Sequence, residues 1–554
     1  MKALGFRQAN SWLHTWSGLL LGWLLFAVFL TGTLSYFRQE ITYWMQPELH
    51  ASQANAHTAE RAMEAMRRMA PDAASWQITL PDERSPTVQA RWYDQGERVA
   101  KGGGKTATLD ASTMEPLSGR PTAGGGFLYR FHFELYGMDR TTGRWIVGIA
   151  TMFMLVAIIS GVIIHKKIFI DFFTFRRRKG QRSWMDAHNA LAVLSLPFHF
   201  MITYSGLLLL MFLLMPWGMD AAYKGDMRAF FADRGRAAAP AAGPGGQKQQ
   251  ALAAPQAMAP VGPMLEAAAS QWPQGIASIS VQQPGREGST IELRQKGAET
   301  LLNHAASERM VFDAGSGQLK EHIRSDVPGA GTSTYNVFSA LHRLRFADVW
   351  LRWLFFVAGV MGTAMVGTGM ILWVVKRLSQ KRKGQYHAGH RLVERLNVAA
   401  IAGLFVALGA YFWLNRLLPA SLPGRAGWEI NGFFIVWALT LAHAWLREHK
   451  QAWKEQLYAI VALFAGLPIV NFSYPDTHLV AAIVNGRWTL VSMDLVLLAT
   501  AALAAWAAWY LRPPAGPARK AAPAKKSSHA APADAGLLRP EAASVQASVQ
   551  EAAS

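Results

Sequence analysis

The chain has 554 residues, of which 51% are hydrophobic and only 16% are charged, and its formal net charge is +19. Soluble domains carry about a quarter charged residues, and the positive charge here lies largely in short connectors beside apolar runs, so the composition favours a membrane protein over a soluble or nucleic-acid-binding one. The chain has no cysteine, which excludes disulfides, iron–sulfur clusters, thiolate zinc sites and covalently attached haem.

Eight apolar runs are long enough to cross about 30 Å of hydrocarbon as helices. The first follows a short basic N-terminus and is interpreted as an uncleaved signal anchor, because no small-residue cleavage site follows it. The predicted spans cover residues 12–37, 144–165, 188–216, 349–375, 394–414, 428–446, 454–472 and 489–511. The sequence therefore predicts a mainly α-helical, polytopic membrane protein with about eight transmembrane helices.

Lysine and arginine determine the expected orientation. The connectors 166–182 and 376–395 are rich in both residues, and the positive-inside rule places such connectors in the cytoplasm. An even number of spans then puts both termini in the cytoplasm, for a protein of a bacterial inner membrane. Segments 38–143 and 217–348 are expected on the periplasmic side.

The two expected periplasmic segments look like copies of one small α+β unit, in the same order of elements. The elements are a helix (62–66, then 263–269), two alternating strands (75–80 and 87–92, then 276–281 and 290–294) and a last strand that ends in Asp-Ala (Asp110-Ala111, then Asp313-Ala314). Two small periplasmic domains are therefore expected.

The transmembrane part is duplicated as well. Arg144-Trp145 opens the second span and Arg352-Trp353 the fourth, and the histidines His132 and His342 precede these pairs. Internal duplication often places a site between the two halves. The predicted division is 1–37 (first span), 38–143 (first outer domain), 144–216 (second and third spans), 217–348 (second outer domain, with a flexible insertion at 235–262), 349–377 (fourth span), 378–512 (four appended spans) and 513–554 (a disordered cytoplasmic tail).

Six histidines lie at span ends or inside spans of the duplicated region: His14, His132, His165, His188, His199 and His342. A single histidine at a span end is usually an interfacial residue. Here His14 matches His188 and His132 matches His342 in the two repeats, which favours a redox cofactor held by imidazoles from facing helices. A haem also needs glycine clearance and cations for its propionates. The glycine candidates are Gly18, Gly22, Gly32, Gly161, Gly206, Gly362 and Gly369, and the propionate candidates are Arg144, Arg343, Arg345 and Arg352.

Other chemical signals are sparse, and we find no phosphate-binding, dinucleotide, zinc-protease or serine-hydrolase motif. Asp494 lies inside the eighth span, where a carboxylate either relays protons or pairs with a neighbouring polar group. We favour the pairing. The remaining histidines near membrane connectors are interpreted as interfacial: His387, His390, His443 and His449.

Four stretches resemble the PepSY-associated transmembrane proteins, namely WLHTWSGL (12–19), SGVIIHKK (160–167), DAHNAL (186–191) and LPFHFMITYSGL (196–207). The two outer units resemble PepSY domains, and the likeness covers about residues 8–377. Some members of this family are ferric-siderophore reductases that carry b-type haem. The chain departs from the family core of four spans by adding four more.

The resemblance implies two haem b groups and electron transfer across the inner membrane, from a quinol or cytoplasmic reductant to a periplasmic ferric siderophore or other ferric chelate, for iron acquisition. One haem is expected near His14, His165 and His188, and the other near His132, His199 and His342. The expected iron ligands are His14, His132, His188, His199 and His342, and their pairing stays open.

Two other interpretations stay open. PepSY units elsewhere are associated with the regulation of peptidases, so the protein would be a non-enzymatic regulatory or sensor protein. Alternatively, the appended spans carry a solute, as in a transporter. Neither alternative predicts a haem.

Overall fold

The structure is a computed structural model that describes residues 5–97, 103–165, 175–176, 179–226, 229, 253–297, 300–302, 308–324, 329–382, 384–474 and 477–511. Three predicted segments lie wholly or partly outside these residues: the tail 513–554, most of the basic connector 166–182, and residues 235–252 of the predicted insertion.

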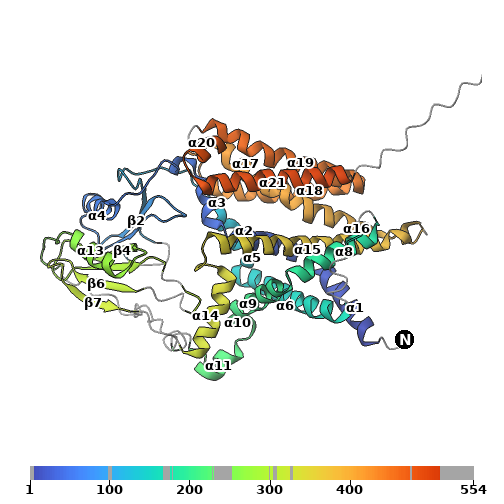
Figure 1. Cartoon of the computed structure of the whole chain (residues 1–554), viewed down its shortest axis with the longest axis horizontal. Coiled ribbons are helices and arrows are strands. Elements are labelled where there is room, and N and C mark those ends of the chain that lie inside the picture. Colours follow the sequence, from blue (N-terminus) through green and yellow to red (C-terminus); the bar gives the residue numbers. More distant parts are fainter. Residues whose placement is uncertain are drawn as a thin grey trace, which may run out of the picture. The chain divides into compact units, whose positions relative to one another are not determined.

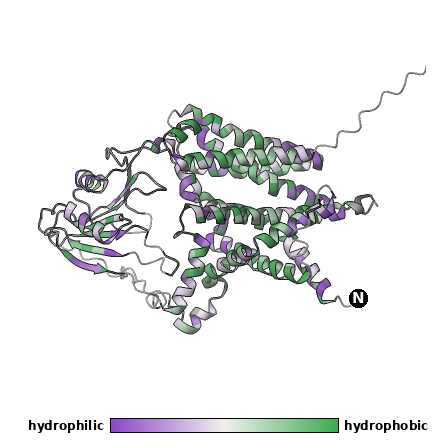
Figure 2. Cartoon of the chain, in the orientation of Figure 1, coloured by the Kyte–Doolittle hydropathy of each residue, from purple (hydrophilic) through white to green (hydrophobic). Residues whose placement is uncertain are grey.

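The chain is mainly helical, and Figure 2 shows that its long helices are predominantly hydrophobic. Within the described residues, six helices are long and apolar enough to cross a membrane. They are α6 (Arg140–Ile164), α15 (Val349–Arg382), α18 (Arg425–Leu446), α19 (His449–Val470), α21 (Trp488–Tyr510) and the continuous run Ala388–Leu417, which consists of α16 (Ala388–Asn397), η2 (Val398–Ala402) and α17 (Gly403–Leu417). Two bent helix pairs raise the number of candidate spans to as many as eight, which agrees with the sequence prediction.

The first and third predicted spans are each broken into two helices (Figure 1). Helices α1 (Phe6–Leu20) and α2 (Gly22–Ser35) meet at 65°, and α8 (Gln181–Leu194) and α9 (Leu196–Leu209) meet at 66°. Pro197 in the first turn of α9 favours the second break, because proline has no N–H to continue the hydrogen bonds of α8. The two repeats therefore share one bent geometry, where composition alone predicted a continuous span.

Short helices complete the chain between the spans. They are α3 (Arg38–Trp44), η1 (Pro47–Leu49), α5 (Gly124–Glu134), α10 (Met211–Leu214), α11 (Trp217–Tyr223), α14 (Ala330–Arg343), η3 (Asn471–Ser473) and α20 (Leu479–Val484). Two of them, α5 and α14, occupy equivalent places in the repeats, directly before the spans α6 and α15.

The two outer units form one antiparallel sheet of seven strands in the order β3-β2-β1-β4-β5-β6-β7. The strands are β1 (Ser75–Thr79), β2 (Val88–Tyr93), β3 (Lys105–Leu109), β4 (Ile276–Gln282), β5 (Thr290–Gln295), β6 (Arg309–Asp313) and β7 (Leu319–Ile323), and the helices on the sheet are α4 (Thr58–Met69) and α13 (Gly262–Gln271). Each unit has the predicted order of helix and strands. The sequence pattern treated them as two domains, but β1 pairs with β4, so that Ile78 lies opposite Ile279.

This pairing explains why the units do not stay separate. Strands β1 and β4 would each be an exposed sheet edge in an isolated unit, and an apolar edge is a liability that pairing removes. The side chains of Trp76, Ile78, Ile279 and Val281 are all buried in one shared hydrophobic core with α4 and α13. The two units therefore share one sheet and one hydrophobic core.

The C-terminal part of the insertion predicted as flexible, 235–262, belongs to the sheet domain. Gln256 N donates to Gly285 O at 2.9 Å, and Ala259 N donates to Ala314 O at 2.7 Å. These bonds attach residues 253–261 to the sheet domain. Strand β7 was not predicted, because its sequence LKEHI is polar and largely exposed and does not show the alternation of a half-buried strand.

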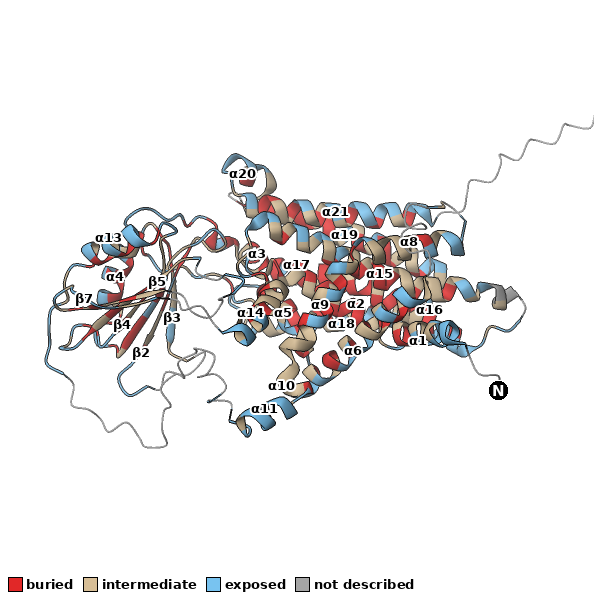
Figure 3. Cartoon of the chain, turned by 60° about the horizontal axis from the view of Figure 1, so that its bottom comes forward, coloured by how far each residue is buried: buried red, intermediate tan, exposed pale blue. Residues whose placement is uncertain are grey.

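The appended helices pack against the duplicated region through buried polar groups, and Figure 3 shows that the helices bury the faces they turn toward one another. Trp44 Nε1 and Asn471 Nδ2 donate to Asp494 Oδ1 at 3.0 and 3.1 Å. The predicted pairing of Asp494 with neighbouring polar groups is thus confirmed. Arg425 and Glu429 form an ion pair whose side chains are fully buried, and Arg425 Nη1 also donates to Pro121 O at 2.8 Å.

Candidate functional site

Four of the six predicted histidines face one another in two pairs. His14 on α1 faces His188 on α8, with ring centroids 6.3 Å apart and ring planes at 69°. His132 on α5 faces His342 on α14, with centroids 6.1 Å apart and planes at 36°. Each pair joins equivalent residues of the two repeats. Both sites therefore lie between the halves, as expected for a duplicated membrane protein.

Hydrogen bonds to backbone oxygens fix three of these rings. A carbonyl oxygen only accepts, so the bonded Nδ1 carries the proton and Nε2 keeps the lone pair that a metal requires. The bonds run from His14 Nδ1 to Ala157 O (2.8 Å), from His188 Nδ1 to Met365 O (2.9 Å) and from His132 Nδ1 to Val28 O (2.7 Å).

The fourth ring, that of His342, is fixed through a serine. Ser205 Oγ donates its own proton to Met201 O at 2.7 Å, so it accepts from His342 Nδ1 at 2.8 Å. The proton of His342 is therefore on Nδ1, as in the other three rings. All four imidazoles present the same nitrogen, Nε2, for a ligand.

A glycine on the neighbouring helix makes room for each ring. A Cβ atom added at Gly32 would lie 2.6 Å from His132 Cε1, closer than real side chains approach. Each glycine lies four residues after the residue whose backbone carbonyl is near the ring. Because glycine has no side chain, nothing on that face of the helix covers the carbonyl. The other contacts of such a Cβ are Gly161 to His14 Cε1 (3.2 Å), Gly206 to His342 Cε1 (3.2 Å) and Gly369 to His188 Cε1 (3.1 Å).

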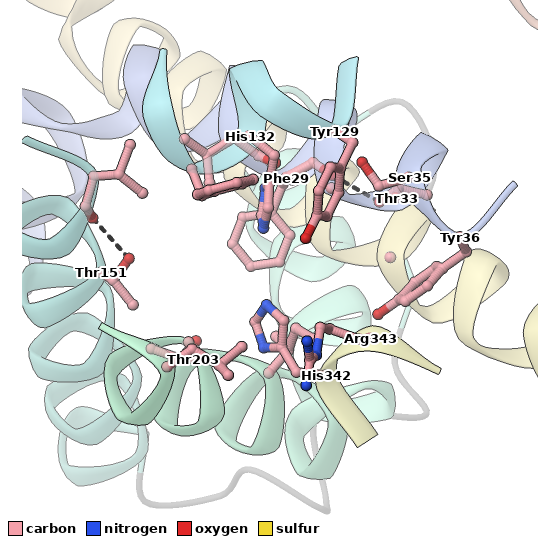
Figure 4. A pocket seen from close by; sticks show the side chains of 18 of the residues that line it. Phe29, Thr33, Ser35, Tyr36, Tyr129, His132, Thr151, Thr203, His342 and Arg343 are labelled. Atoms are coloured by element: carbon pink, nitrogen blue, oxygen red, sulfur yellow. Dashed lines mark hydrogen bonds between the residues drawn. The ribbon is translucent and has the colours of Figure 1, made fainter. Parts of the chain in front are cut away.

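The His132–His342 pair lines a cavity of about 360 Å³. Figure 4 shows the two rings pointing toward one another across it, with Phe29 beside them. The walls are mainly apolar, from α2, α6 and α9. Among the described residues that line it, there are five arginines and no aspartate or glutamate; the arginines are Arg38, Arg84, Arg144, Arg343 and Arg345.

The other two predicted histidines are not in these pairs. Ser195 Oγ donates to Leu191 O, so it accepts from His199 Nε2 at 3.0 Å. His165 Nε2 accepts from Asn189 Nδ2 at 2.9 Å. In both rings Nε2 therefore takes part in a hydrogen bond, whereas in the four paired histidines Nε2 is the nitrogen left for a ligand.

The four arginines predicted to hold propionates have different surroundings. Arg343 and Arg345 line the cavity, and so does Arg144, whose Nη2 donates to Glu134 Oε1 at 2.6 Å. Arg352 is not among the lining residues and forms an ion pair with buried Glu40. Sequence position near the spans suggested these cations, but it does not show that Arg144 has a carboxylate partner on α5 and Arg352 one on α3.

The donor set indicates which kind of metal group fits. Among the described residues, no group of three or more histidine, cysteine, aspartate or glutamate side chains is placed to hold a metal ion. Two imidazoles on opposite sides of one metal, with bonds of about 2 Å and a ring radius of about 1.1 Å, have centroids about 6 Å apart. Both observed spacings match, so the pairs fit a metal whose other ligands come from a macrocycle, as in b-type haem.

Sequence reasoning missed the groups that orient the rings. The acceptors Val28, Ala157 and Met365 are apolar residues whose side chains give no sign that their carbonyls accept from a histidine. The glycines gave the usable signal: four of the seven candidates lie against the paired histidines, whereas Gly18 has no neighbouring side chain or backbone within 4 Å of an added Cβ.

The helices, the sheet and the paired histidines define a polytopic membrane protein of duplicated architecture. The chain belongs to the family with a PepSY-associated TM region, whose model matches residues 11–376. The match ends just before the appended helices. The chain is also similar to the uncharacterized protein PA4219 of Pseudomonas aeruginosa, with 24% identity over 399 residues, which cover 68% of this chain and 93% of that protein.

Proposed function

We propose that this protein is an inner-membrane oxidoreductase that holds two b-type haems and passes electrons across the membrane to a periplasmic ferric chelate, such as a ferric siderophore. The observation that carries the proposal is the geometry of the two histidine pairs. They have the same tautomer, centroid spacings of 6.1 and 6.3 Å, and equivalent positions in both repeats. Interfacial histidines are not required to repeat this paired arrangement in both halves of the protein.

Bound between these pairs, haem b would supply reversible one-electron transfer. The residues supply orientation and insulation. Each Nδ1–H···O bond holds its ring and makes Nε2 a better donor. The mainly apolar lining around His132 and His342 suits a macrocycle, and the arginines of the cavity are the candidate cations for its propionate groups.

The two pairs serve opposite ends of the proposed route. His14 and His188 lie on α1 and α8, the helices that follow the basic N-terminus and the basic connector, so their end is assigned to the cytoplasm. His132 and His342 lie on the short helices that follow the sheet segments, on the side assigned to the periplasm. A quinol or a cytoplasmic reductant supplies the electrons.

The reaction at the far end is the reduction of Fe(III) to Fe(II) by one electron. Hard oxygen donors hold Fe(II) less tightly than Fe(III), because the lower charge attracts them less. Iron is thereby released from its chelate. No proton transfer by the protein is required for this step.

An absorption spectrum tests the proposal directly. The full chain, purified in mild detergent from cells supplied with haem, is expected to show sharp α and β bands after dithionite and two haems per chain. The variants His14→Ala and His132→Ala should each lose one haem, whereas His57→Ala, at an exposed site of the sheet domain, should keep both. A colourless protein would refute the proposal and favour the regulatory alternative.

A further inference from the structure

Tyr36 is a buried residue whose hydroxyl has no hydrogen-bond partner among the described residues. The residue is 8% exposed and directly follows α2. Its ring packs edge-to-face on Phe355, with ring centroids 6.1 Å apart, and Arg84 Nη2 donates to its backbone oxygen at 3.2 Å. These contacts hold the residue without using the hydroxyl. A buried phenol O–H usually has a partner, so we expect that partner in the space beside it.

The space beside the hydroxyl is the cavity in which His132 and His342 face one another, because Tyr36 is one of its lining residues. Figure 4 shows the Tyr36 hydroxyl directed toward the cavity. It also shows Tyr36 and Tyr129 on one side of the two imidazoles and Thr151 on the other. The hydroxyl therefore lies to one side of the axis between the rings, where the periphery of a macrocycle held by both imidazoles is expected.

Arg38 is a cation on the same side of the cavity. It also lines the cavity, and its guanidinium lies 4.6 Å from the ring centroid of Tyr129. Among the described residues, no aspartate or glutamate forms an ion pair with Arg38, whereas Arg84 and Arg144 each have a glutamate partner. A guanidinium has five N–H donors, so the contact with one tyrosine leaves donors for an anion.

We propose that Tyr36 and Arg38 bind one propionate carboxylate of the haem that His132 and His342 hold. A carboxylate accepts from a phenol O–H and from a guanidinium N–H, and bonds to an ionised group are stronger than bonds between neutral groups. A carboxylate of the ferric chelate has the same chemistry. The propionate is favoured because the hydroxyl opens into the cavity of the two imidazoles, and a haem bound there brings its own carboxylates. The inference rests on the proposed function, because it concerns how the periplasmic haem of that function is held.

The contact also sets the orientation of the macrocycle in its cavity. On the side of the imidazoles away from Tyr36, the hydroxyl of Thr151 donates to Val147 O at 2.7 Å and is therefore not free for a ligand. That side suits an apolar edge of the haem, so the propionate edge faces Tyr36. A carboxylate that leaves water needs such donors, because its desolvation otherwise costs free energy.

The test compares haem b with its dimethyl ester, in which both propionates are uncharged. The full chain, depleted of haem in detergent, is titrated with each compound, and binding is followed by absorption. Tyr36→Phe removes only the hydroxyl and should weaken haem b binding at one of the two sites about 10-fold, with a much smaller effect on the ester. Arg38→Gln should act in the same direction. The other site contributes equally to parent and variant, so the difference belongs to this cavity. Tyr204→Phe is the matched control, because it removes a hydroxyl from a residue of α9 that is 41% exposed, and it should change neither affinity.

Unchanged haem b binding in Tyr36→Phe would overturn the proposal and indicate that the hydroxyl contacts only water. An equal loss for haem b and for the ester would also overturn it, because it would show a general disturbance of the cavity. Weaker binding of gallium(III) citrate by Tyr36→Phe, with haem binding unchanged, would assign the hydroxyl to a chelate carboxylate instead. The readout is independent of electron transfer. A parent protein that binds no haem refutes the proposed function, whereas one that binds haem b and the ester equally refutes only the propionate contact.

Discussion

Gly32 offers a sharp test of how His132 is held. A methyl group at this position would lie 2.6 Å from both Cε1 and Nδ1 of the imidazole, well inside van der Waals contact. The ring cannot move aside and keep its 2.7 Å hydrogen bond to Val28 O, because that carbonyl lies one turn away on the same helix. Gly32→Ala is therefore expected to displace His132 from His342.

The size of the effect follows from two contributions. Loss of the hydrogen bond costs about 0.5–1.5 kcal/mol, and overpacking adds about 1–3 kcal/mol. Together they weaken the proposed haem site by roughly 2–4 kcal/mol, which corresponds to a loss of affinity of about 30-fold to 1,000-fold. Gly206→Ala should have a smaller effect, since its Cβ would lie 3.2 Å from His342 Cε1 and a small shift relieves that contact.

The measurement is haem content per chain, with reduced-minus-oxidised spectra, for protein expressed with limiting haem. Gly32→Ala should retain one haem where the parent retains two. Gly18→Ala is the matched control, because it adds the same methyl group to a membrane helix where nothing lies within 4 Å, and it should retain both. Two haems and an unchanged spectrum in Gly32→Ala would refute the placement of His132 as a ligand.

Three further predictions concern other parts of the molecule. His14→Ala and His188→Ala should each remove the same haem, because the two rings act as one unit. In a measurement of haem content, the double variant should therefore lose no more haem than either single variant. Asp494→Leu should lower the melting temperature in detergent and cost about 2–4 kcal/mol, because it leaves two buried N–H donors without an acceptor, while Asp494→Asn should cost less. The pKa of Asp313 is lowered, chiefly by a hydrogen bond from the Lys320 side chain and by others from Ser316. The ionised carboxylate therefore stabilises the fold above about pH 4, the pKa in the unfolded chain, and this stabilisation is lost as the pH falls below that value. Hydrogen exchange of β6 should rise in acid for the parent and change less for Asp313→Asn.

The sequence predicted the spans well and their geometry poorly, for a physical reason. Hydropathy reports which residues avoid water, and it does not report the direction of a helix axis. The bends at Leu21 and Ser195 were therefore missed, although Pro197 was a local sign of the second one. The same limit explains the sheet: alternation identified β1 and β4 as strands, but strand pairing is a long-range contact that alternation does not encode.

Repeat matching predicted four equivalent histidines but not their partners. Within one repeat, His14 donates to α6 and His132 donates to α2, and these local contacts fix each ring. The facing partner always comes from the other repeat. No sequence spacing within a repeat predicts such a contact, which explains why the sequence leaves the pairing open and places His165 and His199 at the same two sites.

The appended helices contact α5, one of the four helices that carry a paired histidine. Tyr411 on α17 donates its hydroxyl to Gly124 O at 3.0 Å, at the start of α5. Phe127 and Phe131 of the same helix pack against Phe433 of α18, at centroid distances of 5.2 and 6.2 Å. Helix α5 carries His132, so the appended helices contact the element that presents one of the four paired histidines. The extra four spans thus support one ligand helix of the proposed periplasmic site, so a family core of four spans does not make them dispensable here.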